Sequence, residues 1–123
     1  MQIRFTRLNH VQLPIPTGAE ERAREFYGGL LGLEEIEKPD ALKPGGGMWF
    51  NVAGIQLHIS IEDGQSPSKR HPAFEVKDLD EVKSYLQQNG VRLRDEVQIP
   101  NYKRLSFFDP FGNRIELLEH VDG

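Results

Sequence analysis

One stretch near the end of the chain reads Phe108-Asp109-Pro110-Phe111-Gly112-Asn113-Arg114-Ile115-Glu116-Leu117. Pro110 and Gly112 occupy positions that are typical of a turn. The residues after Gly112 alternate between the two faces of a strand. Glu116 is the fourth residue after the glycine, on the face opposite the aliphatic residues. The same spacing occurs in Gly54-Ile55-Gln56-Leu57-His58. The two segments are therefore predicted to be equivalent strands of a duplicated unit.

The duplication extends toward the N-terminus from both segments. A strand-like run over residues 10–15 precedes a helical pattern that ends at Gly32, and a run over 71–76 precedes one that ends at Gly90. His10 thus corresponds to His71, and His58 to Glu116, with separations of 58 − 10 = 48 and 116 − 71 = 45 residues. Each half is predicted to be strand, helix, strand, strand, strand. The predicted fold class is α+β, in a single domain over residues 1–123 with modules at about 1–62 and 70–121.

Local signals predict where the helices begin and where the chain is mobile. Thr17 with Glu20 matches a capping box at the first helix, and Asp78 with Glu81 supplies side chains that can cap the second. The segment over residues 38–47 is rich in proline and glycine. It is predicted to be a mobile loop.

Composition excludes several classes of function. The formal net charge is −4 and the basic residues form no stripe, which argues against a nucleic-acid partner. The chain has no cysteine, which excludes disulfides, thiol nucleophiles and Cys-ligated zinc. The N-terminal residues mix apolar and charged side chains, and no apolar run approaches membrane-spanning length. We expect a cytoplasmic protein with no membrane partner.

The four corresponding residues, His10, His58, His71 and Glu116, all lie opposite the aliphatic face of their strands. They are expected on the side of the sheet that the helices leave free, which becomes a cleft if the sheet curls. Polar residues on that side are commonly only solvated. Their pairwise correspondence through the repeat instead favours one shared site.

Three imidazoles and one carboxylate suit a divalent transition metal such as Zn, Mn, Fe, Co or Ni. They do not suit Ca or Mg, which prefer oxygen ligands. Without His58, two histidines and one carboxylate remain. That set occurs in non-haem iron oxygenases and is equally compatible with Lewis-acid chemistry on a bound substrate oxygen.

Several motifs resemble the vicinal oxygen chelate superfamily, whose members include glyoxalase I, fosfomycin resistance enzymes, methylmalonyl-CoA epimerase, extradiol dioxygenases and bleomycin-binding proteins. The resemblance covers essentially the whole chain. The motifs are Asn9-His10-Val11, Phe26-Tyr27-(x)2-Leu30-Leu31-Gly32-Leu33, His71-Pro72-Ala73-Phe74 and, above all, the stretch from Phe108 to Leu117.

The resemblance implies two βαβββ modules that form a U-shaped mixed sheet around a metal cleft, commonly in a homodimer whose chains can share a site. His10, His71 and Glu116 match the three ligand positions of the metal-binding members. His58 matches a fourth position, which is a glutamate in glyoxalase I, and this departure argues against glyoxalase I activity. Extradiol cleavage is disfavoured because those enzymes usually contain a second pair of modules.

Other residues follow from the same resemblance or from their position. Tyr102 and Arg104 match places where related enzymes hold an anionic substrate, although a surface loop is an equal alternative. Trp49 can line the pocket wall. Gln12 and Gln56 lie on the faces of the proposed ligands and can orient them. Glu116 and His58 are the predicted catalytic residues.

Two functions are consistent with these features. The first is a metal-dependent enzyme acting on a small oxygen-rich substrate that chelates the metal, with lyase, isomerase, group-transfer and oxygenase chemistry all open. The second is a metal-free protein that sequesters an antibiotic or similar ligand, as bleomycin-resistance proteins do. The retained ligand set favours the enzyme.

Overall fold

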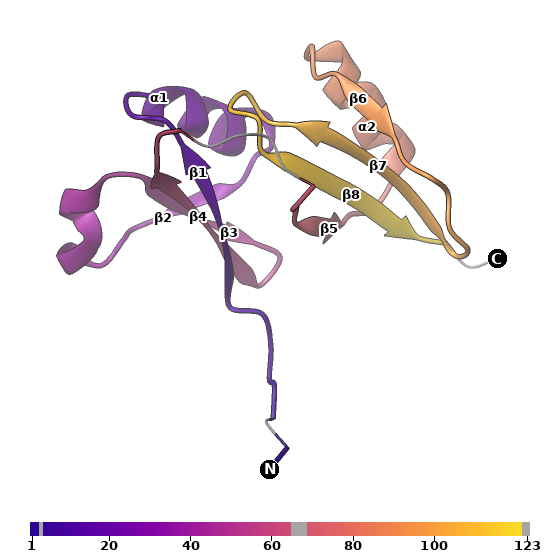
Figure 1. Ribbon diagram of the computed structural model, residues 1–123. Coiled ribbons are helices and arrows are strands. Elements are labelled where there is room, and N and C mark those ends of the chain that lie inside the picture. The colour runs from indigo at the N-terminus through magenta and orange to yellow at the C-terminus, as the bar shows by residue number, and fades with distance from the viewer. Residues whose placement is uncertain (3, 65–68, 122–123) are drawn as a thin grey trace. The chain divides into compact units, whose positions relative to one another are not determined.

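The computed structural model describes residues 1–2, 4–64 and 69–121, in two compact units, Met1–Gly64 and Gln65–Gly123 (Figure 1). Each unit contains one four-stranded mixed sheet and helical segments, in the order of a βαβββ module. The predicted α+β class with two such modules is confirmed. None of the helices within the described ranges is long and apolar enough to cross a membrane.

The first unit is built on a sheet with strand order β1-β4-β3-β2. Strand β1 pairs in parallel with β4, and the other neighbours are antiparallel. A short α-helix runs directly into a π-helix between β1 and β2. The elements are β1 (His10–Ile15), α1 (Glu20–Ala23), η1 (Arg24–Leu30), β2 (Glu34–Ile36), η2 (Asp40–Gly45), β3 (Met48–Val52) and β4 (Ile55–Ile61).

The second unit repeats this order around a sheet with strand order β5-β8-β7-β6 (Figure 1). Strand β8 is central, parallel to β5 and antiparallel to β7. Helix α2 contacts both β6 and β8. The elements are β5 (Ala73–Glu75), α2 (Leu79–Gln88), β6 (Leu93–Asp95), β7 (Tyr102–Phe108) and β8 (Arg114–His120).

Each sheet buries one face against its own apolar core, as the alternation predicts. In the first unit the most deeply buried side chains include Ile15, Tyr27, Phe50 and Leu57. In the second unit they include Leu86, Phe107 and Ile115. The opposite face of each sheet is left for polar residues, and this is where the candidate site residues lie.

The predicted start of the first helix was wrong. The N-cap residue is Ala19 and makes no side-chain capping bond. Thr17 instead donates from its backbone N and its hydroxyl to the carboxylate of Asp63, at 2.8 and 2.6 Å. Glu20 accepts a hydrogen bond from the backbone N of Gly47. These side chains tie the helix start to distant segments of the same unit and do not cap it.

The second helix has Asp78 as its N-cap residue, as predicted, but the predicted side-chain cap was wrong. Asp78 adopts a left-handed conformation with φ 56° and makes no side-chain capping bond. The carboxylate of Glu119, on β8, accepts hydrogen bonds from the backbone N atoms of Asp78 and Leu79 at 2.8 and 3.1 Å. A negative charge at a helix N-terminus is favourable, so a strand residue performs the capping function.

The segment predicted as a mobile loop contains the 3₁₀-helix η2. The ammonium of Lys43 forms ion pairs with Glu37 and Asp40 at 2.7 and 2.8 Å. Gly47, just before β3, has φ +79°, and a Cβ atom there would clash with the carbonyl oxygen of Ile59. The chain therefore needs glycine where this segment meets the sheet.

The turn between β7 and β8 is held by one buried carboxylate. Asp109 accepts hydrogen bonds from the backbone N atoms of Phe111 and Asn113 and from the side-chain amide of Asn113, at 2.8 to 2.9 Å. Gly112 completes the turn with a positive φ. This local network fixes the length of the turn and hence the register in which β8 presents Glu116.

Candidate metal site

The first unit brings His10 and His58 together. In the parallel pairing of β1 with β4, His10 lies opposite Gln56 and Gln12 lies opposite His58, so both histidines share one face. Their rings stack with centroids 4.0 Å apart and an interplanar angle of 15°. The two residues that the repeat assigns to one half of the chain are therefore in contact.

Trp49 covers the other side of the His58 ring. Strand β3 places it directly opposite His58, with ring centroids 3.8 Å apart and planes parallel to within 1°. Burial lowers the pKa of His58 below its usual value, and electrostatic repulsion from His10 and Lys38 lowers it further. His58 is therefore neutral at pH 7 and retains a nitrogen lone pair. Phe50, the neighbour of Trp49, is fully buried in the core.

Hydrogen bonds fix which nitrogen of each imidazole can bind a cation. Nδ1 of His10 lies 2.9 Å from the side-chain oxygen of Asn9, and Nε2 of His58 lies 2.9 Å from that of Gln56. An amide oxygen accepts hydrogen bonds, so each of these nitrogens carries the proton. In the neutral form of each ring, the lone pair lies on Nε2 of His10 and on Nδ1 of His58. Gln56 thus contacts His58 as predicted.

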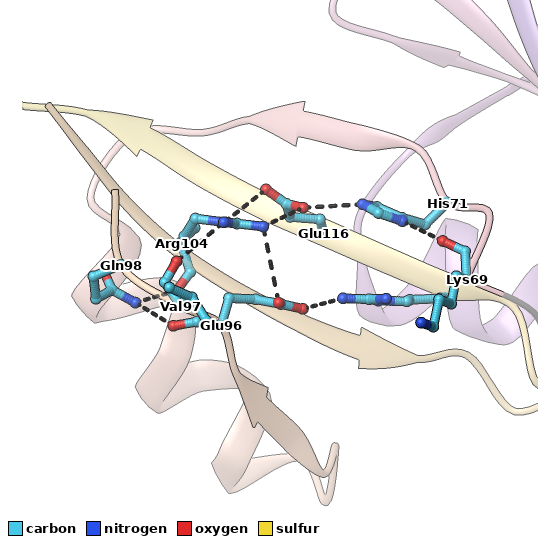
Figure 2. A network of polar contacts seen from close by, with 8 residues as sticks. Lys69, His71, Glu96, Val97, Gln98, Arg104 and Glu116 are labelled. Atoms are coloured by element: carbon cyan, nitrogen blue, oxygen red, sulfur yellow. Dashed lines mark hydrogen bonds and ion pairs between the residues drawn. The ribbon is translucent and has the colours of Figure 1, made fainter. Parts of the chain in front are cut away.

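The second unit brings His71 and Glu116 together (Figure 2). His71 Nε2 lies 3.0 Å from Glu116 Oε1, and His71 Nδ1 lies 2.8 Å from the carbonyl oxygen of Lys69. A carbonyl only accepts, so Nδ1 carries a proton, and Nε2 without one would present a lone pair to a carboxylate oxygen. Two lone pairs at this distance repel each other. A proton or a metal ion between them turns the contact into an attractive one.

The donor set therefore fits a transition metal. Two donors that bind the same ion at about 2.1 Å each lie roughly 3 Å apart, which matches the contact of His71 with Glu116. In metal sites the ligating histidine usually donates its other N–H to a carbonyl or carboxylate, as His71 does to Lys69. In the described ranges, no group of three or more metal-binding side chains gathers. Each unit by itself supplies a pair.

Glu116 is also held by an arginine. Nε and Nη2 of Arg104 each donate to one oxygen of Glu116 at 3.2 Å, a bidentate contact across neighbouring strands β7 and β8. Arg104 Nη1 donates to the carbonyl oxygen of Val97 at 3.0 Å. Glu116 is buried, with a side-chain exposure of 7% against 19% for Arg104. The carboxylate is thus held in one orientation by two hydrogen bonds from the guanidinium.

The chain of charges continues beyond Arg104 (Figure 2). One oxygen of Glu96 lies 3.8 Å from Arg104 Nη2, and the other accepts a hydrogen bond from Arg114 Nη2. The Ser106 hydroxyl, followed by Arg114, lowers the pKa of Glu96 below its usual value. Two arginines and two carboxylates therefore alternate on the polar face of the second sheet.

Tyr102 is the remaining predicted substrate contact. It lies at the start of β7, on the same face as Arg104, and its ring meets that of His120 edge to face at 5.2 Å. Tyr102 and Arg104 both belong to β7 and so do not lie in a surface loop, the alternative that the sequence left open.

Sequence reasoning missed Glu96, the structural use of Arg114 and the carbonyl of Lys69. Glu96 and Arg114 are 18 residues apart and Arg104 and Glu116 are 12 apart. No local spacing identifies these pairs. The charge pattern gives one usable signal, since Arg104, Arg114 and Glu116 all fall on one face of an antiparallel strand pair.

Comparison with known families identifies the superfamily of the chain. Residues 7–117 match the family model of the Glyoxalase/Bleomycin resistance protein/Dioxygenase superfamily. The chain belongs to this superfamily. The match spans both βαβββ units, including the four predicted ligands.

Solved structures of the glyoxalase superfamily are similar over nearly the whole chain. One from Bacillus anthracis, described as a glyoxalase family protein, is 44% identical, with 98% of this chain and 99% of that chain covered and a TM-score of 0.91. FosX from Listeria monocytogenes, complexed with Mn(II) and sulfate, is 20% identical, with coverages of 98% and 93% and a TM-score of 0.75. Lactoylglutathione lyase from Agrobacterium tumefaciens is 20% identical, with coverages of 94% and 95% and a TM-score of 0.74. The last two likenesses concern the fold alone. Among curated proteins no match was found.

Proposed function

We propose that this protein is a metal-dependent enzyme of the glyoxalase superfamily, acting on a small oxygen-rich substrate that chelates the metal. The ligands are His10, His71 and Glu116, with His58 as a fourth, from one chain or from two chains of a homodimer. Zn, Mn, Fe, Co or Ni suits three imidazoles and one carboxylate.

One observation supports this proposal above the others. His71 Nε2 and Glu116 Oε1 face each other at 3.0 Å, with His71 oriented by the carbonyl of Lys69. Such a pair is stabilised by a cation placed between them. The FosX structure that shares this fold contains Mn(II), which makes a divalent ion a reasonable cation to test first.

The surrounding residues have distinct proposed roles. When bound, the metal supplies Lewis-acid stabilisation of the negative charge that develops on a substrate oxygen. His58 is neutral, and its Nδ1 can accept a substrate proton if it does not ligate. Trp49 holds the His58 ring in one plane. Arg104 and Tyr102 share the face that bears Glu116 and are placed to contact an anionic part of the substrate.

A metal-free binding protein is the second candidate. The observation that favours it is the bidentate contact of Arg104 with Glu116, because this contact satisfies the carboxylate without a metal. A proton on His71 would then take the place of the metal ion. The two candidates differ in one measurable property, the affinity for a divalent ion.

Calorimetric titration of chelator-treated protein with Mn²⁺ tests the proposal. Wild type is expected to bind one ion per site, and both His71→Ala and Glu116→Gln should weaken binding by about 100-fold or more, since even losses around the ligands cost 10- to 100-fold. His120→Ala is the matched control, because His120 is exposed and lies four residues beyond Glu116 on β8. Its affinity should equal that of wild type.

Saturable binding by wild type that survives both ligand substitutions would contradict the assigned ligands. No saturable binding of Mn, Fe, Co, Ni or Zn would contradict the enzyme and favour the metal-free binder. Protein loaded with metal would next be assayed, with and without oxygen, against thiol hemiacetals, epoxides and catechols to identify the reaction class.

A further inference from the structure

Arg104 lies between two carboxylates of the second unit (Figure 2). Its guanidinium contacts both oxygens of Glu116 at 3.2 Å and stands 3.8 Å from the nearer oxygen of Glu96. All three side chains are largely buried, with exposures of 19%, 7% and 13%. The guanidinium of Arg104 therefore binds Glu116, and a small rotation of its side chain would bring it within hydrogen-bond distance of Glu96.

The local charge count changes when a metal ion binds. Arg104 and Arg114 together balance Glu96 and Glu116, so this cluster is neutral without a metal. A divalent ion on Glu116 adds two positive charges next to the guanidinium that already uses this carboxylate. Like charges repel more strongly in a buried, low-dielectric site than in water. The ion and Arg104 therefore compete for the same carboxylate.

We propose that Arg104 is an internal competitor of the metal at Glu116, and that Glu96 is the acceptor toward which its guanidinium turns when a metal ion binds. The inference rests on the proposed function, because it requires Glu116 to be a ligand. Arg104 then sets the affinity of the site for metal. It is a positioning residue that acts through Glu116.

Glu96 is suited to receive the guanidinium. Its far oxygen is anchored by Arg114, so the near oxygen keeps a fixed position facing Arg104. The Ser106 hydroxyl and Arg114 hold the pKa of Glu96 below its usual value, and the residue is ionised at pH 7. Arg104 Nη1 remains tied to the carbonyl oxygen of Val97, which limits the motion to a local turn of the side chain.

Replacing Arg104 by an uncharged residue distinguishes competition from simple support. If Arg104 competes with the ion, Arg104→Met should lower the Kd for Mn²⁺ by about tenfold or more, measured by calorimetry on chelator-treated protein. If Arg104 only holds Glu116 in place for the metal, the same substitution should raise the Kd. An unchanged or raised Kd would overturn the inference.

Glu96→Gln tests the second acceptor. It should raise the Kd for Mn²⁺ by about threefold or more in the wild-type background, because the displaced guanidinium loses its partner. In the Arg104→Met background its effect should be clearly smaller, since no guanidinium remains to be received. Equal effects in the two backgrounds would show that Glu96 acts on the metal independently and would overturn this part of the proposal.

Lys103→Met is the matched control for charge. Lys103 is the adjacent residue on the opposite face of β7, in an exposed ion pair with Asp80 at 3.0 Å. The Lys103→Met variant loses one positive charge, as Arg104→Met does, but leaves Glu96, Arg104, Arg114 and Glu116 unchanged. Its Kd for Mn²⁺ should therefore change by less than about twofold. Circular dichroism and thermal melting confirm that each variant is folded. Wild type that binds no metal would refute the proposed function, whereas wild type that binds while Arg104→Met binds no tighter would refute only this inference.

Discussion

Position 47 accepts only glycine without strain. Its φ of +79° lies in the left-handed region, and an added Cβ would run into the carbonyl oxygen of Ile59 on the neighbouring strand. The carbonyl belongs to the backbone of β4 and cannot rotate away. Gly45, two residues earlier, has open space around it and no positive φ. The two glycines therefore make a natural experimental pair.

Gly47→Ala should lower the free energy of unfolding by at least about 2 kcal/mol, because backbone strain and a backbone clash add. Gly45→Ala should change it by less than about 1 kcal/mol. Urea denaturation followed by circular dichroism measures both. Equal stabilities of the two variants would show that the segment before β3 can relax.

The faces on which single residues lie could be predicted from the sequence more easily than their contacts. The alternation of aliphatic and polar residues records which face of a strand is buried, so the faces of His58 and Glu116 were predictable. The contact partners were less so. Gln56 is two residues from His58 and was predicted, whereas Glu96 reaches Arg114 across 18 residues and was not.

At the scale of the elements, the strands were predicted well and the side-chain caps of the helices poorly. A capping box is a local signal, and neither expected cap forms. Thr17 instead binds Asp63, 46 residues away, and the amide of Leu79 at the start of α2 binds Glu119, 40 residues away. No spacing rule within a helix can anticipate this.

The contact of Asp63 with Thr17 predicts a pH effect on stability. Hydrogen bonds from the Thr17 hydroxyl and backbone N lower the pKa of Asp63, so the folded protein holds the ionised form more strongly than the unfolded chain does. This stabilisation is present above the unfolded pKa of about 4 and is lost as the pH falls through the lower folded value.

Asp63→Asn should therefore be less stable than wild type at pH 7, and the difference should shrink as the pH falls below about 4. Thermal melting of both proteins across this range measures it. The control is Asp80→Asn, an exposed residue whose partner Lys103 is also on the surface. A difference for Asp63→Asn that stays constant with pH would contradict the assignment.

At the scale of the whole molecule, the duplication gives each unit one pair of candidate ligands. His10 stacks on His58 in the first unit, and His71 meets Glu116 in the second. The correspondence was visible in the sequence because equivalent residues follow equivalent glycines. The binding of one ion by both pairs depends on how the two units are assembled. The residue pattern within each half does not contain this information.

The sole tryptophan of the chain makes this property measurable. Trp49 stacks on His58 at 3.8 Å, so if the proposed metal site includes His58, an open-shell ion such as Co²⁺ or Ni²⁺ should quench its fluorescence. His71→Ala, a change in the second unit, should abolish the quenching at micromolar metal, and His120→Ala should preserve it. Undiminished quenching in His71→Ala would mean that the first pair binds metal by itself.

The hydrogen bonds of Asp109 have an evolutionary consequence. Strand β8 presents Glu116 on its polar face and also sends Glu119 to the start of α2. An insertion or deletion of one residue in the preceding turn would exchange the two faces of β8. Glu116 would then point into the apolar core, and Glu119 would no longer cap α2. Descendants of this protein can diversify their chemistry by varying other loops, but this hairpin has to be inherited at constant length.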